Sequence, residues 1–530
     1  MIYSLKLLCA LFVFGGIGAY AFRRAFAELM SAEDYRRAWT GIALATCAVF
    51  LAKFPLLLCV AIFVIALFQA NHMRSGVVGN LSVFALLAFV LPPIEYSLGG
   101  LGDISYVTSF SHFRVLTLAL LVVPALTLMF GRGERKRGGF FWVDLAILGY
   151  QVLRLVLLAP SSTATTLLRT ALTATLDVLI PYYVITRGIR TFAELRFILS
   201  HLALGLAFVA CAGLLEFALQ RNIYTPLQGV YGVSWQLTYA LYRGGLVRVQ
   251  ATAEVPINLA VMMSFGLGLW IWLRGAQWRQ RPVLLVFAAL AVVLAATWSR
   301  GPWLAAGVMA IVIAVLSRMP PGLFRVLLLV VVALGLGIEL TGADSGIVAF
   351  LGALFGSDKA ELSTINYRRE LLSMSLALIK QSPWAGVPNY AYQLQALRQG
   401  EGIIDLVNSY VGIMLDSGIP GLAVYLAPFV IVTHRLLNAI RRTPMGALES
   451  GSRFAIAMVG VILGLLFAIF TTSTFGVLSM LLTLSVAFPL SWLTMPEDKR
   501  YSTGTEPFRS GALRRAVARP GAFVPVQTRL

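Results

Sequence analysis

The sequence predicts an all-α, polytopic membrane protein with about 14–15 transmembrane helices and one large polar loop that contains short amphipathic helices. Two observations support this prediction. Hydrophobic residues make up 59% of the 530-residue chain and charged residues only 12%, whereas roughly a quarter of the residues of a soluble domain are charged. The apolar residues also gather in stretches of about 17–25 residues, the length at which a helix crosses the hydrocarbon core of a bilayer.

The chain is strongly basic, with a formal net charge of +19. Such a balance can indicate nucleic-acid binding, but here the basic residues cluster between the apolar stretches, as the positive-inside rule expects. We therefore expect the lipid bilayer, and no nucleic acid, among the partners. The cysteines all fall in apolar segments, so neither a disulfide framework nor a metal-ligand spacing is evident: they are Cys9, Cys47, Cys59 and Cys211.

The first apolar segment, Leu5–Phe22, has no convincing small-residue cleavage site and is followed by more spans, so we interpret it as a retained helix. Arg23 and Arg24 begin a basic loop that belongs inside, which puts the amino terminus outside. The next apolar stretch, Trp39–Ala70, is too long for one span. Lys53-Phe54-Pro55 interrupts it, and a residue before proline disfavours helix, so two short helices are predicted.

The later spans follow from the same pattern of apolar runs and basic loops, of which GRGERKRGG at residues 131–139 is the strongest cytoplasmic marker. We expect a membrane domain over residues 1–495, outer loops over residues 220–254 and 341–418, and a basic, disordered cytoplasmic tail over residues 496–530. The remaining predicted spans are Leu81–Leu98, Phe113–Phe130, Phe140–Leu158, Ala164–Ile185, Phe197–Leu219, Val255–Leu273, Pro282–Thr297, Pro302–Leu316, Leu323–Leu340, Ile419–Val432, Phe454–Phe470 and Phe475–Leu493.

The second outer loop contains two predicted helices. The first begins at Asn366 as its N-cap, and Pro383 ends it. Its apolar residues recur at helical spacing, which is typical of an amphipathic helix. The second begins at Asn408 and stops at Gly418, with a proline just beyond. This places Asp416 at the negative end of a helix, where a carboxylate is disfavoured. The apolar positions of the first helix are Leu371, Met374, Leu378 and Ile379.

Four arginines fall on the outer face, against the prevailing charge bias: Arg248, Arg300, Arg368 and Arg369. Guanidinium groups bind phosphate bidentately and stay charged when partly desolvated, so these residues predict an anion site for a diphosphate. The alternative for each is that it reaches to lipid headgroups or pairs locally, with Glu254 or Glu370 for example. For Arg300, in a tight turn between two spans, we favour the functional interpretation.

Four motifs in register carry a family resemblance. They are RVQATAEVPINLA from Arg248, TWSRGPWLA from Thr297, the run from Tyr367 to Val387, and the run from Asn408 to Leu422. Together they resemble the O-antigen ligase and polymerase superfamily of bacterial membrane glycosyltransferases. The resemblance implies a metal-independent enzyme of the inner membrane, without a cofactor, that acts at the periplasmic face. It implies that the donor is an undecaprenyl-diphosphate-linked oligosaccharide and that Arg248, Arg300 and Arg368 or Arg369 hold its diphosphate. It also implies that the acceptor is a glycan or lipid, with a chain-length regulator protein as a possible further partner.

One departure from the family pattern matters. Many members have His-Asn at the last motif, whereas this chain has Val407-Asn408, so a histidine base is absent there. Carboxylates are the remaining candidates for activating an acceptor hydroxyl. Asp405 is the first choice, although a carboxylate at such a position more often serves loop solvation or helix entry, and the other candidates are Asp416, Glu254 and Glu401.

Aromatic residues of the outer loops could stack on sugars, but tyrosine and tryptophan are also enriched at membrane interfaces in general. The candidates are Trp384, Tyr390, Tyr392, Tyr231, Trp235 and Tyr239.

The function that the sequence favours is polymerisation of polysaccharide repeat units, because the histidine is missing. Two alternatives stay open: a ligase that attaches glycan to lipid A core or protein, and a transporter of lipid-linked saccharide. Charges inside spans would support transport, but they are few: Asp144, Arg154, Asp177, Glu216 and Glu339.

Overall fold

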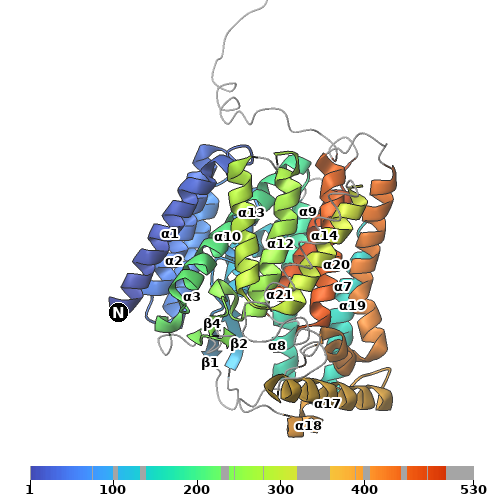
Figure 1. Ribbon diagram of the computed structural model, residues 1–530. Coiled ribbons are helices and arrows are strands. Elements are labelled where there is room, and N and C mark those ends of the chain that lie inside the picture. Colours follow the sequence, from blue (N-terminus) through green and yellow to red (C-terminus); the bar gives the residue numbers. More distant parts are fainter. Residues whose placement is uncertain are drawn as a thin grey trace, which may run out of the picture.

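The computed structural model describes residues 2–74, 76–99, 106–131, 139–227, 238–243, 245–277, 280–318, 359–387, 390–397, 406, 408–442, 450–473, 476–496 and 500. Figure 1 shows most of the helices running side by side in one bundle, with helix α17 lying across one end of it. Two short antiparallel hairpins, β1–β2 and β3–β4, are the sheet structure of the described residues. The all-α polytopic class is therefore confirmed.

Eight helices of the described residues are long and apolar enough to cross a membrane, or nine if the bent pair α5–α6 counts as one, and four shorter apolar helices accompany them. The helices are α1 (Ile2–Phe26), α2 (Ala32–Leu51), α3 (Pro55–His72), α4 (Val77–Leu87), α5 (His112–Leu120), α6 (Val122–Phe130), α7 (Phe141–Leu158), α8 (Ala164–Ala174), α9 (Ile180–Gly188), α10 (Phe192–Leu219), α12 (Pro256–Arg274), α13 (Arg281–Ala296), α14 (Arg300–Leu316), α17 (Lys359–Gln381), α18 (Tyr390–Gln393), α19 (Ser409–Arg442), α20 (Ser450–Phe470) and α21 (Val477–Leu493). The strands are β1 (Glu95–Gly99), β2 (Tyr106–Ser111), β3 (Tyr242–Arg243) and β4 (Leu246–Val247).

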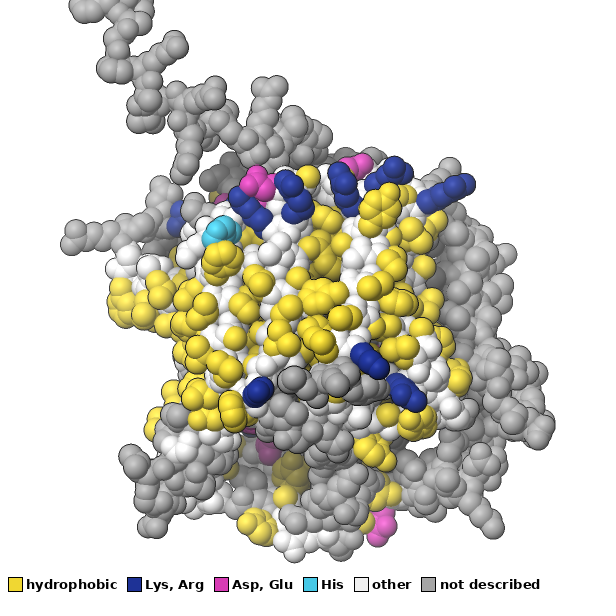
Figure 2. Space-filling view, turned by 90° about the vertical axis from the view of Figure 1, so that its left-hand side faces the viewer, with side chains coloured by type: hydrophobic (Ala, Val, Ile, Leu, Met, Phe, Trp, Pro, Cys, Tyr) yellow, Lys and Arg dark blue, Asp and Glu magenta, His cyan; other side chains and the backbone are white. Residues whose placement is uncertain are grey.

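Helices α10, α12 and α20 form the centre of the bundle. Their most apolar windows are 78%, 89% and 72% buried, against 33% for α1 and 17% for the window that contains α7. A helix that is apolar all round and buried belongs to a core, whereas α1 and α7 present apolar side chains outward. Figure 2 shows such side chains covering the middle of one face, below a rim rich in lysine and arginine. This is the surface that a bilayer would cover.

The two ends of the bundle differ. Both hairpins and helices α17 and α18 lie at one end (Figure 1). At the opposite end α1 finishes with Arg23 and Arg24, and α19 finishes with Arg441 and Arg442. We call the first the hairpin end and the second the arginine end.

Several predicted boundaries are confirmed. Helices α2 and α3 meet at the Lys53-Phe54-Pro55 break. Gly418 interrupts α19 with φ of 67°, and Asn408 caps its first segment, because its Oδ1 accepts from the amide of Tyr410 at 3.0 Å.

Two predictions are wrong, and a third span is present but bent. The predicted span Leu81–Leu98 ends as α4 at Leu87 and continues into β1, because consecutive prolines at 92 and 93 cannot extend a helix. The predicted span Phe113–Phe130 consists of α5 and α6, which are bent by 44° and together are apolar enough to cross a membrane. Pro124 cannot donate to the carbonyl of Leu120, and Asn80 Nδ2 donates to that oxygen instead, at 2.8 Å. Finally, α17 begins at Lys359, so Asn366 lies inside the helix. The predicted span Leu323–Leu340 lies outside the described residues.

Candidate functional site

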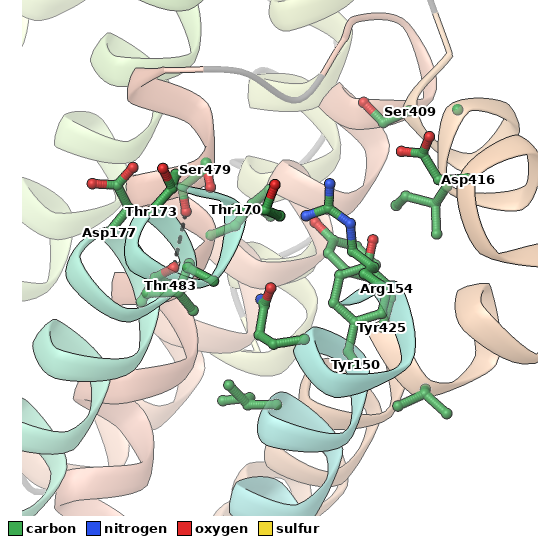
Figure 3. A pocket seen from close by; sticks show the side chains of 18 of the residues that line it. Tyr150, Arg154, Thr170, Thr173, Asp177, Ser409, Asp416, Tyr425, Ser479 and Thr483 are labelled. Atoms are coloured by element: carbon green, nitrogen blue, oxygen red, sulfur yellow. Dashed lines mark hydrogen bonds between the residues drawn. The ribbon is translucent and has the colours of Figure 1, made fainter. Parts of the chain in front are cut away.

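A cavity of about 610 Å³ opens near the hairpin end of the bundle. Four helical segments surround it: α7, α8 with its π-helical continuation Thr175–Leu179, α19 and α21. Each contributes a stripe of residues at helical spacing, so one face of each helix turns to the cavity. Figure 3 shows their side chains converging.

Most of the stripes change from polar to apolar as they run from the hairpin end toward the middle of the bundle. On α7 the order is Arg154, Gln151, Ile147, and on α21 it is Ser479, Thr483, Val486. An amphiphile with a charged head and a hydrocarbon tail would match this gradient. The stripe of α8 is the exception, since it carries polar residues from Arg169 through Thr173 to Asp177. The apolar inner lining of the cavity comprises Ala146, Ile147, Val178, Pro428, Phe429, Leu482 and Val486.

Asp416 and Arg154 both line the outer part of this cavity (Figure 3). Both side chains are half-buried. Neither forms a hydrogen bond or an ion pair within the described part of the chain; the Arg154 guanidinium carbon lies 5.8 Å from the centre of the Tyr150 ring. A carboxylate and a guanidinium that are not used by the fold are candidates for contact with a ligand.

The turn at Gly418 fixes the position of Asp416. The amide of Ile419 donates to the carbonyl of Pro383 at 2.8 Å, and the amide of Val387 donates to that of Leu415 at 2.6 Å. A Cβ atom at Gly418 would lie 2.6 Å from the backbone of Trp384. The close approach and the positive φ therefore both require glycine, and the PWAGV and DSGIPG motifs dock on each other.

Helix α17 covers this turn. Leu371, Leu378 and Ile379 pack with residues of the first segment of α19 in a small separate core, as the amphipathic pattern predicted, and Met374 packs against its edge. Tyr390 joins the edge of this core and lines the cavity. Burial, and after it the charge of Asp416, raises the pKa of Tyr390 to about 12, so its phenol remains a hydrogen-bond donor at neutral pH.

Arg248 lies outside the cavity and braces the turn between α13 and α14. Its Nε donates to the carbonyl of Thr297 at 3.2 Å, and its Nη2 donates to Ser299 Oγ at 3.0 Å. Burial, and secondarily the like charge of Arg243, lowers the pKa of Arg248 to about 10. The guanidinium therefore stays charged at neutral pH.

Arg300 is the first residue of α14 and is exposed at the hairpin end. The turn that carries it adjoins the cavity through the loop that follows α20. A Cβ atom at Gly301 would lie 2.4 Å from Thr471 Oγ1, and the carbonyl of Thr472 accepts from Ser409 Oγ at 2.5 Å. Ser409 lines the cavity. Arg369 is exposed on α17, and neither it nor Arg300 lines the cavity; the side chain of Arg368 lies outside the described residues.

Of the two predicted carboxylates that the structure describes, Asp416 lines the cavity and Glu254 does not. Glu254, with φ of 69°, ends a short 3-10 turn, Ala251–Ala253. A Cβ atom built at Gly476, which precedes α21, would lie 3.9 Å from its Oε2. Asp405 and Glu401 lie outside the described residues, as do Tyr231 and Trp235.

Of the predicted sugar-stacking aromatic residues, some are exposed at the surface and one lines the cavity. Trp384 is 76% exposed, Tyr392 72% and Tyr239 57%, so Tyr390 alone among the described candidates lines the cavity.

Sequence reasoning missed Arg154, Arg169, Thr173 and the pair Arg114–Asp177 as site residues. The sequence contains a signal for two of them, because Arg154 and Asp177 are charged residues inside predicted spans. From the sequence alone, such charges support a transporter rather than a glycan-transfer site. Arg169 and Thr173 gave no distinct signal, because a basic or hydroxyl residue near a span end is ordinary. In the described ranges, no three His, Cys, Asp or Glu side chains gather in a way that could hold a metal ion.

The apolar bundle and its polar cavity define a polytopic membrane protein with a site suited to an amphiphilic ligand. Residues 285–426 match the sequence model of the family described as O-antigen ligase. This match confirms the resemblance to the O-antigen ligase and polymerase superfamily and points to an activity of that type. The matched stretch includes Arg300, Tyr390 and Asp416, but neither Arg154 nor Arg248. Among curated proteins, none matches this chain.

Proposed function

We propose that the protein is a polysaccharide polymerase that joins undecaprenyl-diphosphate-linked repeat units at the periplasmic face of the inner membrane. The observation that carries the proposal is the cavity in which Arg154 and Asp416 are both left unpaired by the described residues, next to an apolar inner lining. In this arrangement the polyprenyl chain occupies the apolar part, and the diphosphate lies near Arg154 and Arg169. The hydrocarbon chain then contacts apolar side chains, and the anionic diphosphate contacts cationic side chains.

The arginines act on the leaving group. As the bond between the anomeric carbon and the diphosphate oxygen breaks, negative charge grows on that oxygen, and a fixed guanidinium stabilises it. Arg154 is available for this contact because it makes no hydrogen bond or ion pair with a described residue. Arg300 and Arg369, both exposed at the hairpin end, together with Arg368, are proposed to receive the departing diphosphate. Arg248 holds the turn that precedes α14, the helix that begins with Arg300.

Asp416 acts on the acceptor. An acceptor hydroxyl attacks the anomeric carbon, its proton passes to the Asp416 carboxylate, and the lipid diphosphate leaves. The docked turn at Gly418 holds this carboxylate in place. Asp405 is the alternative base and Glu254 a further one.

The test uses purified protein in lipid nanodiscs with lipid-linked repeat units and no other acceptor. A ladder of lengthening products supports the polymerase. If nothing forms until lipid A core or a protein acceptor is added, and one glycan is then transferred whole, the ligase interpretation replaces it. Movement of the lipid-linked glycan without a new glycosidic bond would instead indicate a transporter. Because no metal takes part in the proposed steps, the ladder is expected to persist in a chelator.

Two variants test the roles in the same assay. Asp416→Asn should slow transfer about 10²–10⁴-fold, the usual contribution of a general base, with little effect on donor binding. Arg154→Ala should reduce transfer about 10²–10³-fold, and Arg154→Lys should restore little, because an ammonium does not reproduce the guanidinium fork. Glu33→Gln and Arg37→Ala, in an exposed pair on α2, are the matched controls. Full activity of the Asp416 and Arg154 variants at normal expression would reject these assignments.

A further inference from the structure

One part of the cavity is lined by hydroxyl groups rather than by free charges or hydrocarbon. Figure 3 shows Thr173, Asp177, Ser479 and Thr483 on the side of the cavity away from Asp416, with Thr170 between them and Arg154. The side chains of this part come from α8, its π-helical continuation and α21. We call this part the hydroxyl lobe; its residues are Thr170, Thr173, Asp177, Ser479 and Thr483.

The one charged member of the lobe, Asp177, is already paired. Arg114 Nε and Nη2 donate to its carboxylate at 2.9–3.1 Å. Arg114 Nη1 donates to the carbonyl and the hydroxyl of Ser109, both at 2.7 Å. Every guanidinium nitrogen of Arg114 therefore already donates to the protein, and its charge is paired with Asp177 rather than directed to a ligand in the lobe.

The hydroxyl groups offer both kinds of hydrogen bond. Thr170 and Thr483 donate to carbonyl groups one turn earlier, at 2.8 and 3.0 Å, so their oxygens can still accept. The hydroxyls of Thr173 and Ser479 make no hydrogen bond among the described residues, so each can donate and accept.

Three kinds of ligand can be compared for this lobe. A hydrocarbon tail would leave the hydroxyl groups without partners, which is unfavourable in a site removed from water. A phosphate would meet the Asp177 carboxylate, while Arg114, which pairs with that carboxylate, is not among the residues that line the cavity. A neutral polyol carries hydroxyl groups that both donate and accept, so it can give a hydrogen-bond partner to each hydroxyl group of the lobe.

We propose that the hydroxyl lobe is a subsite for one neutral sugar residue of the glycan substrate. This inference rests on the proposed function, because it takes the same cavity as the site of glycan transfer. The lobe adjoins the Arg154–Asp416 part, so the bound sugar lies next to the reacting bond. It belongs either to the donor or to the acceptor, and binding experiments separate the two.

The experiment measures equilibrium binding to purified protein in nanodiscs with three probes. The first is lipid-linked repeat unit extracted from cells before polymerisation. The second is the saccharide released from it by mild acid, and the third is undecaprenyl diphosphate without sugar. In Thr173→Val and Ser479→Ala, saccharide binding should weaken by about threefold to tenfold for each hydrogen bond lost, and undecaprenyl diphosphate should bind as before. Thr175→Val is the matched control, because its hydroxyl donates to the carbonyl of Ala171 at 2.8 Å and does not line the cavity.

Each outcome has one meaning. Weaker binding of the lipid-linked unit by the same factor assigns the sugar to the donor, and unchanged binding of that unit assigns it to the acceptor. If folded Thr173→Val and Ser479→Ala bind the released saccharide as well as the native protein does, or if the native protein does not bind it, the subsite is overturned. Failure of the native protein to bind undecaprenyl diphosphate would instead overturn the proposed function and leave the saccharide result standing.

Discussion

The guanidinium of Arg114 and the carboxylate of Asp177 form a two-pronged ion pair in the wall of the cavity. Arg114 Nε lies 3.1 Å from both oxygens of Asp177, and Nη2 lies 2.9 Å from Oδ2. The two side chains are 12% and 25% exposed. The pair connects the start of α5 to the π-helical segment Thr175–Leu179, a type of irregularity that is frequent at functional sites.

This pair predicts a specific pattern of stability. Asp177→Ala leaves the Arg114 charge half-enclosed without its partner, so it should cost on the order of 3 kcal/mol in the free energy of unfolding. The double variant Arg114→Met/Asp177→Leu should cost less than Asp177→Ala alone, because no charge is left unpaired. Thermal denaturation of the protein in nanodiscs measures both. A double variant that is no more stable than Asp177→Ala would contradict this prediction.

Arg300 provides a test of the donor site that the sequence predicted. Arg300→Ala should abolish polymer while the protein level stays normal, because it removes a contact to the diphosphate, and Arg300→Lys should rescue poorly. The readout is polymer length in cells and ladder formation with the purified protein. Arg369→Ala, exposed on α17, is the informative comparison. If Arg300→Ala makes polymer as the native protein does, then Arg154 and Arg169 must carry the diphosphate without it.

The sequence was sufficient for features that local chemistry decides. The break at Pro55, the glycine turn at Gly418 and the cap at Asn408 follow from the backbone limits of proline, glycine and short polar side chains. The buried face of α17 follows from the spacing of Leu371 and Leu378.

The cavity depends instead on which faces of distant helices meet. Arg114 and Asp177 are 63 positions apart, and Arg154 and Asp416 come from helices separated by much of the chain. Periodicity identifies an apolar face but does not name its neighbour. Likewise, the alternation of basic loops predicted at which end of the bundle Arg248 lies. It did not predict that the guanidinium of Arg248 would donate a hydrogen bond to the carbonyl of Thr297.

The turn that carries Arg248 is strained, and a buried carboxylate supports it. Ala251 has φ of 43°, an unfavourable conformation for a residue with a Cβ atom. Its amide donates to Oε2 of the fully buried Glu216 at 2.7 Å. The hydroxyl of the next residue, Thr252, donates to the carbonyl of Phe89 at 2.7 Å.

Glu216→Ala should therefore destabilise the protein by about 1–3 kcal/mol, because it leaves a buried amide without an acceptor. Glu216→Gln keeps an oxygen in the same place and should lose less. Thermal denaturation measures the free energy of unfolding. Donor binding reports whether the turn that carries Arg248 has moved. Equal losses in the two variants would contradict a stabilising role for the hydrogen bond to Ala251.

The last prediction concerns the side of the membrane that each end of the bundle faces. Basic loops stay in the cytoplasm, and the arginine end holds Arg23, Arg24, Arg441 and Arg442. We therefore expect the hairpin end, with Tyr392 exposed on α18, to face the periplasm. In a background without the native cysteines, a membrane-impermeant maleimide should label Tyr392→Cys in intact cells. It should label Arg441→Cys only after the membrane is permeabilised, and retained polymer synthesis by both variants serves as the control for folding. Labelling of Arg441→Cys from outside would reverse the orientation, place Asp416 and Arg154 on the cytoplasmic side, and remove the periplasmic site on which the proposed polymerase depends.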